Sequence, residues 1–122
     1  MLFRSAGFAA LTLLLAGCSS NSADTSPNNS EITQVIDVRT ADEFAAGHIA
    51  GAINIDVESS GFSAGIATLD PDGVYLVYCH SGRRSAIAAQ SMSDSGFTVL
   101  DGGGIDAMQA NGWKIEIGRA HV

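Results

Sequence analysis

From residue 31 onward, short apolar runs alternate with segments of helical pattern. The runs lie at residues 35–38, 52–55, 74–78 and 97–100, and a final extended segment covers residues 113–117. The four runs lack polar alternation, so each predicts a strand that is buried on both faces. Residues 74–78 are apolar throughout and are predicted to form the central strand. Strands separated by helices pair in parallel through right-handed crossovers, so the pattern predicts an α/β fold.

Helices are predicted between these strands. Thr40 and Glu43 form a capping box at the start of a short helix that ends at Gly47. Residues 84–95 have the pattern of a helix that Gly96 terminates. The residues expected to face inward from this helix are Ile87, Ala88 and Met92.

Two further segments complete the pattern. Residues 59–69 are ambiguous, because Phe62, Ile66 and Leu69 have helical spacing but two glycines weaken the prediction. A short helix is expected around residues 105–110.

Residues 1–17 are set apart from the fold as an export signal. Arg4 supplies a positive start, and residues 6–16 form an apolar run, which is shorter than the roughly 20 residues needed to cross a bilayer. The run ends in Leu15-Ala16-Gly17-Cys18, which resembles the lipobox of bacterial lipoproteins, where the cysteine is lipidated and becomes the first residue. The alternative is ordinary signal-peptidase cleavage nearby. The lipoprotein interpretation is favoured because a polar segment follows the cysteine directly.

The segment 18–30 is expected to combine the lipidated Cys18 with a flexible polar tether, since residues 19–30 carry no large apolar side chain. Residues 31–122 are then the folded domain. Several acyl chains on Cys18 would hold the protein on a membrane. The expected location is the bacterial cell envelope, on the extracytoplasmic or periplasmic side.

Composition narrows the possible functions. The 122 residues fit one domain, and 46% of them are hydrophobic, which is ordinary for a globular protein. Removal of residues 1–17 leaves five basic and thirteen acidic side chains, a formal charge of −8. Such a charge argues against nucleic acid as a partner. Two cysteines cannot form a disulfide scaffold or a four-thiolate zinc site.

The candidate catalytic residues directly follow the predicted central strand. They lie at its carboxyl end, where open parallel sheets bind ligands. The chain there reads Cys79-His80-Ser81-Gly82-Arg83-Arg84-Ser85 and then enters a helix. Loop amides, the helix start and two arginines all favour an anion, and we infer that this anion is the Cys79 thiolate. Gly82 suits the tight loop that this requires. A buried, structural cysteine is the alternative, which the arginines and the glycine disfavour.

These residues, with others along the chain, resemble the rhodanese-like sulfurtransferases over about residues 32–117. The landmarks are Asp37-Val38-Arg39, Glu43-Phe44, residues 47–55, the Cys79 loop and Gly102-Gly103-Gly104. The resemblance implies a five-stranded parallel sheet flanked by helices on both faces. It also implies that a donor such as thiosulfate passes its outer sulfur to Cys79, and that cyanide or a thiol accepts it from the persulfide.

The resemblance assigns roles within the loop. Cys79 and Arg84 are the catalytic candidates, with Arg84 on the sulfonate end of thiosulfate. The candidate substrate-binding residues are His80, Ser81, Gly82, Arg83, Ser85 and Arg39. Related phosphatases place five residues between cysteine and arginine, whereas Cys79 and Arg84 are separated by four, and Ser85 stands at the phosphatase arginine's place. The smaller ring suits sulfur rather than a phosphoryl group.

Other landmarks have two interpretations. Arg39 is either a second cation that orients substrate or, with Asp37, a residue that fixes loops through hydrogen bonds, and we favour the second. His48 is expected to be structural rather than a general base. Met108 stands where many family members have a tryptophan at the mouth of the active site, and Trp113 is expected in the core. His48, His80 and His121 show no ligand spacing, so neither a metal nor a cofactor is expected.

Two alternative functions remain beside sulfur transfer: a non-catalytic binding or regulatory module, and a phosphatase or arsenate reductase. An exposed, ionised Cys79 outside the cytoplasm would be prone to oxidation, and the fold offers no second cysteine to resolve a sulfenic acid. We therefore expect an external thiol reductant or redox protein as a partner.

Overall fold

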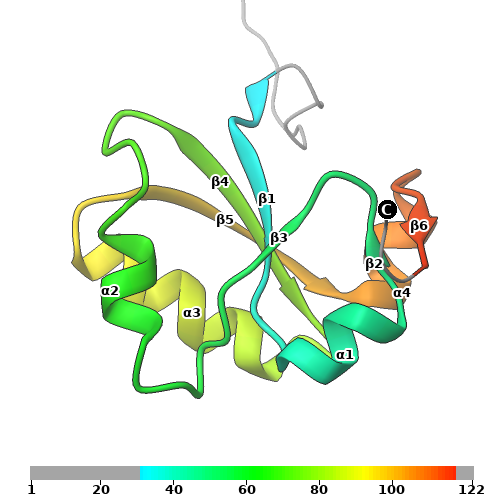
Figure 1. The fold of residues 1–122 in the computed structure, drawn as a ribbon. Helices are drawn as coiled ribbons and strands as arrows, with labels where there is room; N and C mark the ends of the chain where they lie inside the picture. Colours follow the sequence, from blue (N-terminus) through cyan, green and yellow to red (C-terminus); the bar gives the residue numbers. More distant parts are fainter. Residues whose placement is uncertain (1–30, 118–122) are drawn as a thin grey trace, which may run out of the picture.

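Four parallel strands form the central sheet of the computed structural model, which describes residues 31–117 (Figure 1). Their order in the sheet is β3 (Ile53–Asn54), β1 (Gln34–Asp37), β4 (Val74–Cys79) and β5 (Thr98–Gly104). The predicted central strand is confirmed, since β4 has parallel neighbours on both sides. Residues 1–30 and 118–122 lie outside the described part, and with them Cys18 and the predicted signal and tether.

The expected fifth strand does not join this sheet. Its residues form β6 (Ile115–Glu116), which pairs antiparallel with β2 (His48–Ile49) in a separate two-stranded sheet. The amide of Ala50 donates to the carbonyl of Lys114 at 2.8 Å and extends this pairing. The prediction of five parallel strands is therefore wrong, because the last segment finds its backbone partners in β2.

Helices cover both faces of the sheet, as predicted. The four helices are α1 (Ala41–Ala46), α2 (Phe62–Ile66), α3 (Arg83–Asp94) and α4 (Ile105–Ala110). Side chains of α2 and α3 pack on one face, and those of α1 and α4, with β2, pack on the other. In Figure 1 these two groups lie at opposite sides of the crossing strands. Within residues 31–117, no helix is long and apolar enough to span a membrane.

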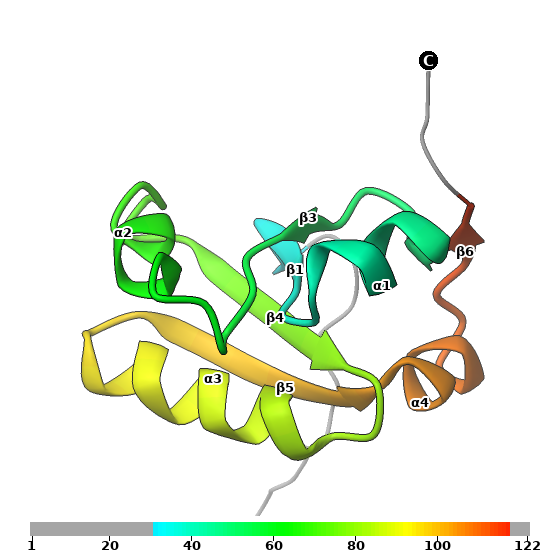
Figure 2. The same cartoon turned by 60° about the horizontal axis from the view of Figure 1, so that its bottom comes forward.

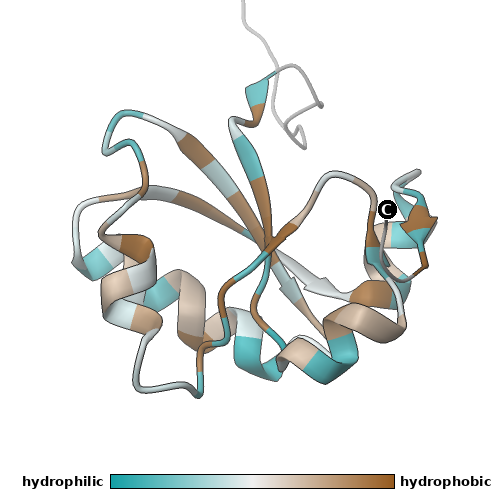
Figure 3. Cartoon of the chain, viewed as in Figure 1, coloured by the Kyte–Doolittle hydropathy of each residue, from teal (hydrophilic) through white to brown (hydrophobic). Residues whose placement is uncertain are grey.

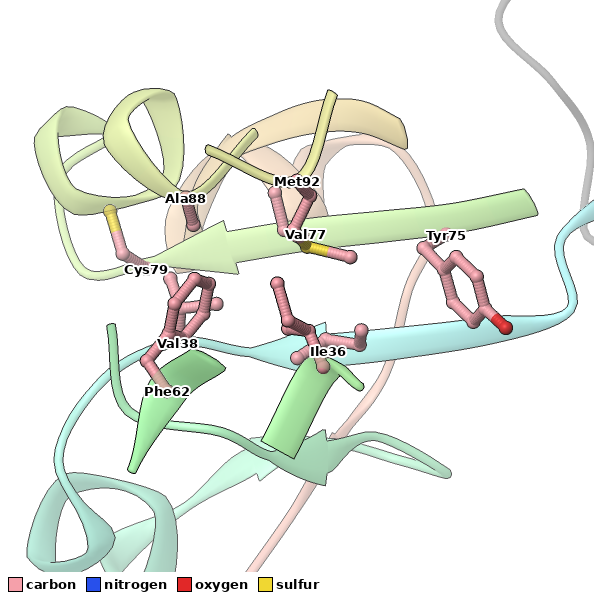
Figure 4. Close-up of a cluster of buried hydrophobic side chains, with 9 residues drawn as sticks. Ile36, Val38, Phe62, Tyr75, Val77, Cys79, Ala88 and Met92 are labelled. Atoms are coloured by element: carbon pink, nitrogen blue, oxygen red, sulfur yellow. The ribbon is translucent and has the colours of Figure 1, made fainter. Parts of the chain in front are cut away.

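Alternate residues of β4 supply the two cores. Tyr75, Val77 and Cys79 belong to the core beneath α2 and α3 (Figure 4), whereas Leu76 and Tyr78 face the other. Adjacent residues of a strand point to opposite faces, so a run without polar positions fills both cores at once. Figure 3 shows hydrophobic residues where the strands cross.

The helices follow the sequence pattern with one exception. Thr40 and Glu43 form the expected capping box, and the ambiguous segment 59–69 contains a helix that buries Phe62 and Ile66. On α3, Ala88 and Met92 are buried, but Ile87 is 52% exposed. The inward prediction for Ile87 is wrong because Ser85, Ala88 and Met92, spaced three and four residues apart, occupy the buried stripe.

Candidate active site

The chain turns directly from the end of β4 into α3, and Cys79 lies at this turn (Figure 2). The amide of Gly82 donates a hydrogen bond to the Cys79 Sγ atom at 2.9 Å. Gly82 has a φ of +103°, a conformation that side chains rarely tolerate, which explains the glycine at this position. In Figure 4 the sulfur points towards the loop that leads into α3 and away from Phe62.

Polar groups around the sulfur favour its ionised form. Burial raises the pKa of the Cys79 thiol, but hydrogen bonds from Ser85, through its hydroxyl and its amide, act in the opposite direction. The amides of Gly82 and Ser81 add to this effect. The pKa therefore lies below its ordinary value, which increases the nucleophilic fraction at neutral pH.

Cys79 is not exposed, contrary to the expectation behind the oxidation argument. Its accessible surface is 0% of the reference value, and it contacts the core that contains Val38 and Phe62. The cradle of amides nevertheless faces the sulfur, so the residue is more than an apolar filler.

The glycine triplet of β5 lies against the Cys79 loop. A β-carbon on Gly104 would come within 2.5 Å of the carbonyl oxygen of His80, and Gly104 forms a bridge with Ser81. The Ser85 hydroxyl also contacts the carbonyl of Gly103 at 3.4 Å. A side chain at position 104 would collide with the loop, so the glycine there allows β5 to lie directly against it.

Arg84 lies in the first turn of α3 and forms an ion pair with Glu43 of α1. Its Nη1 and Nη2 atoms donate to the two carboxylate oxygens at 2.8 and 3.1 Å. The pKa of Glu43 falls to about 2, chiefly because of the hydrogen bond from Arg84. The pKa of Arg84 is raised, chiefly by Glu43 and also by the charge of Cys79. Arg84 therefore places a positive charge near the sulfur.

Comparison with known proteins identifies the family. Residues 21–110 match the family described as "Rhodanese-like domain". This chain belongs to the rhodanese-like domain family. Over 69 residues it is 33% identical to the thiosulfate sulfurtransferase PspE of Escherichia coli K12, a match covering 57% of this chain and 66% of PspE. It is 40% identical over 73 residues to the thiosulfate sulfurtransferase GlpE of Pseudomonas aeruginosa LESB58, covering 57% of this chain and 64% of GlpE. The chain thus spans just under two thirds of these relatives.

Solved structures of rhodanese-like proteins share the fold. A rhodanese with anions from E. coli has a TM-score of 0.60 at 29% identity, and the match covers 70% of this chain and 98% of that one. A rhodanese-related protein from Thermoplasma volcanium has a TM-score of 0.61 at 34% identity, and the match covers 69% of this chain and 83% of that one. The α/β architecture described above is therefore the rhodanese-like fold.

In this rhodanese-like domain, Arg39 is engaged away from the sulfur. Its Nε atom donates to both oxygens of Asp37, at 2.9 and 3.0 Å, and its Nη2 atom donates to Asp37 at 2.6 Å and to the carbonyl of Gly47 at 2.7 Å. Both residues are buried. Tyr78 donates a further hydrogen bond to Asp37 at 2.7 Å. These contacts fix the end of β1 and the loop at Gly47, and we assign no substrate contact to Arg39.

His48 is similarly occupied by structural contacts. Its ring stacks on Phe44 with centroids 3.7 Å apart, and Nδ1 lies 2.8 Å from the carbonyl of Phe44. Nε2 lies 3.6 Å from Glu116 of β6. The histidine therefore joins α1 to the small sheet.

The remaining candidates lie at different depths. His80, Ser81 and Arg83 are exposed, whereas Ser85 is buried beside the sulfur. Met108 is buried in the second core rather than at an active-site mouth, and Trp113 packs against the same core. Residues 31–117 contain no group of three or more possible ligands placed to hold a metal.

Sequence reasoning missed two contributors. The sequence places Glu43 in a capping box and in a landmark of the family, but it does not indicate that the Glu43 carboxylate binds Arg84. Tyr78 was identified only as an apolar strand residue, although its hydroxyl bonds Asp37 and accepts from the amide of Ile49 at 2.8 Å. The pairing of Glu43 with Arg84 spans 41 residues, and no local pattern indicates it.

Replacement of Ser85 by alanine should raise the pKa of Cys79, because the thiolate loses its hydroxyl donor. A hydrogen bond to a charged group contributes roughly 1.5–3 kcal/mol, so alkylation of Cys79 near pH 7 should slow by about tenfold or more. The rate rises with pH as the thiol ionises, and the midpoint should move to higher pH in Ser85→Ala. Alkylation by iodoacetamide measured across pH tests this. Ser81→Ala is the matched control, because Ser81 acts through its amide; identical profiles for both variants would contradict the assignment.

Proposed function

We propose that the chain is a sulfurtransferase that carries a sulfane sulfur on Cys79. The observation that carries the proposal is the hydrogen bond from the Gly82 amide to the Cys79 sulfur at 2.9 Å. Ser81 and Ser85 act with this amide to lower the pKa of the thiol. The names of the curated relatives, thiosulfate sulfurtransferase, support the same activity. A binding module without chemistry has no need of an ionised, amide-bound cysteine.

The reaction has two steps that balance. The Cys79 thiolate attacks the outer sulfur of thiosulfate, the sulfur–sulfur bond of the donor breaks, and sulfite leaves with the electron pair of that bond. The persulfide anion then remains in the amide cradle. Cyanide takes the outer sulfur as thiocyanate, or a thiolate takes it as a new persulfide, and each regenerates the Cys79 thiolate. A persulfide donor enters in the same way.

The acceptor comes from outside the fold. Cys79 is the only cysteine in residues 31–117, so no neighbouring thiol can take the sulfur. We assign this step to an external thiol or a thiol-reducing redox protein. The sequence of residues 1–30 supports a location in the cell envelope, with Cys18 as the lipid anchor and the domain on the extracytoplasmic or periplasmic side.

Loop length separates this proposal from phosphatase or arsenate reductase chemistry. Four residues lie between Cys79 and Arg84, and the place of the phosphatase arginine holds Ser85. The Ser85 hydroxyl donates a hydrogen bond to the carbonyl of Gly82 at 3.1 Å and so closes the loop. A ring closed in this way fits a single sulfur atom better than a tetrahedral phosphoryl group.

Mass spectrometry after thiosulfate treatment of the full chain tests the proposal. We expect one added sulfur atom on the peptide that contains Cys79, an equal amount of sulfite in solution, and removal of the added sulfur by cyanide. An unmodified Cys79 would overturn the proposal. Turnover of an aryl phosphate without a persulfide would overturn it in favour of the phosphatase alternative.

A further inference from the structure

Arg84, the residue expected to bind the sulfur donor, already forms an ion pair with the carboxylate of Glu43. Both oxygens of Glu43 accept hydrogen bonds from Arg84, and Oε1 accepts two more, from the amide and the hydroxyl of Thr40, each at 3.1 Å. The side chains of Arg84 and Glu43 are 17% and 34% exposed. Four hydrogen bonds fix this carboxylate, so the ion pair is a built part of the site rather than a loose surface contact.

The pair balances the positive charge of Arg84, whereas Arg83, the other arginine of the loop, is exposed. A guanidinium has five N–H donors, and Glu43 occupies two of those on Arg84. The charge of Glu58 also acts on Arg84. Because the pKa of Glu43 is about 2, its carboxylate stays ionised throughout the pH range in which Cys79 forms a thiolate. A donor therefore meets an arginine whose charge is already balanced.

This arrangement penalises donors according to their charge. A donor with two negative charges must approach the balanced pair of Arg84 and Glu43, the charge of Glu58 and the thiolate together. A donor with one negative charge meets less repulsion, and three N–H groups of Arg84 make no hydrogen bond to residues 31–117. We propose that Glu43 is a positioning residue that holds Arg84 and makes the site discriminate against dianionic sulfur donors in favour of monoanionic ones. The inference rests on the proposed sulfur transfer.

A comparison of two sulfur donors that differ by one negative charge measures the effect of that charge. Thiosulfate and methanethiosulfonate present the same outer sulfur, but a methyl group replaces one charged oxygen in the second. In both reactions the Cys79 thiolate attacks the outer sulfur and the sulfur–sulfur bond breaks. The leaving group takes the electron pair, as sulfite in one case and as methanesulfinate in the other. The ratio of kcat/KM for thiosulfate to that for methanethiosulfonate therefore reports how the site treats the extra charge.

The Glu43→Gln variant of the full chain tests the proposal. Glutamine is also suited to the third helical position of a capping box, so α1 should persist, and circular dichroism checks this. The thiosulfate-to-methanethiosulfonate ratio should rise by about five- to tenfold over wild type, since the extra charge of thiosulfate then meets an unbalanced Arg84. The gain should shrink at high salt, because salt screens partly exposed charges. A purely structural role for Glu43 would lower both rates and leave the ratio unchanged.

Asp94→Asn is the matched control. It removes one negative charge from the same helix as Arg84, about 15 Å along the axis at 1.5 Å per residue, and should leave the ratio unchanged. If the Glu43→Gln variant does not fold, the same ratio of kcat/KM values is measured in Glu58→Gln. We expect this ratio to rise by about twofold over wild type. A ratio that stays the same or falls in the deciding variant overturns this inference alone. A wild-type chain that gains no sulfur from either donor overturns the proposed function as well.

Discussion

Replacement of Cys79 by serine should reduce sulfur transfer from thiosulfate to cyanide by at least about a thousandfold. The serine hydroxyl fits the same amide cradle, but it remains protonated near neutral pH and is a weak nucleophile without an adjacent base. Removal of the nucleophile from an enzyme with a covalent intermediate has effects of this size or larger. Thiocyanate formation measured with wild type and Cys79→Ser at equal protein concentration tests the prediction.

The chain contains a matched control for this experiment. Cys18→Ser removes the only other cysteine, so its rate should equal that of the wild-type chain in solution. If Cys18→Ser lost activity while Cys79→Ser kept it, the sulfur would be carried outside the domain, and the assignment of Cys79 would fail. Far-UV circular dichroism of Cys79→Ser checks that the buried serine leaves the fold intact.

The main sheet was predictable because its strands fill two cores. The run 74–78 carries large side chains at every position, and only a strand between two covered faces uses all of them. The capping box of α1 was predictable for a different reason, since Thr40 and Glu43 satisfy backbone amides that lie within one helical turn. Local rules and burial patterns suffice for features of these kinds.

The small sheet was not predictable in the same way. Strands β2 and β6 contain two residues each, and their pairing joins Ile49 to Ile115 across the whole domain. A two-residue strand has too few positions to show alternation. The exposure of Ile87 has a related cause, because Ser85, a polar residue, takes a buried place on α3 that the pattern offered to an apolar side chain. Ser85 is buried beside Cys79, and its hydrogen bonds lower the pKa of the Cys79 thiol.

Within the site, residues that follow one another were predictable, whereas residues that meet across the fold were not. The amide cradle arises from the continuous segment 79–85, and Gly82 indicated its tight turn. The depth of Cys79 was not predicted, because it depends on side chains such as Phe62 and Val38 from other elements. The binding of Arg84 to Glu43 depends equally on how α1 and α3 are placed.

The second prediction concerns the buried hydrogen-bond network of Asp37, Arg39 and Tyr78. Asp37 accepts hydrogen bonds from the Arg39 side chain, from the Arg39 amide at 2.9 Å and from the hydroxyl of Tyr78. Burial lowers the pKa of Arg39, but the hydrogen bond and the charge of Asp37 more than offset this. Tyr78 precedes Cys79 in β4, so the network anchors the strand that carries the sulfur.

Asp37→Asn should lower the free energy of unfolding by about 3–5 kcal/mol, since it leaves the Arg39 guanidinium buried without its counter-charge. Small domains have total stabilities of about 5–15 kcal/mol, so the loss is a large fraction of the whole. Urea denaturation followed by circular dichroism measures this loss of stability.

Asp72→Asn, at an exposed turn, is the control and should change stability by less than about 0.5 kcal/mol. The double variant Asp37→Asn, Arg39→Gln should lose less than the sum of the two single losses, because the pair is broken only once. Strict additivity would show that Asp37 stabilises the domain through Tyr78 and the backbone rather than through Arg39.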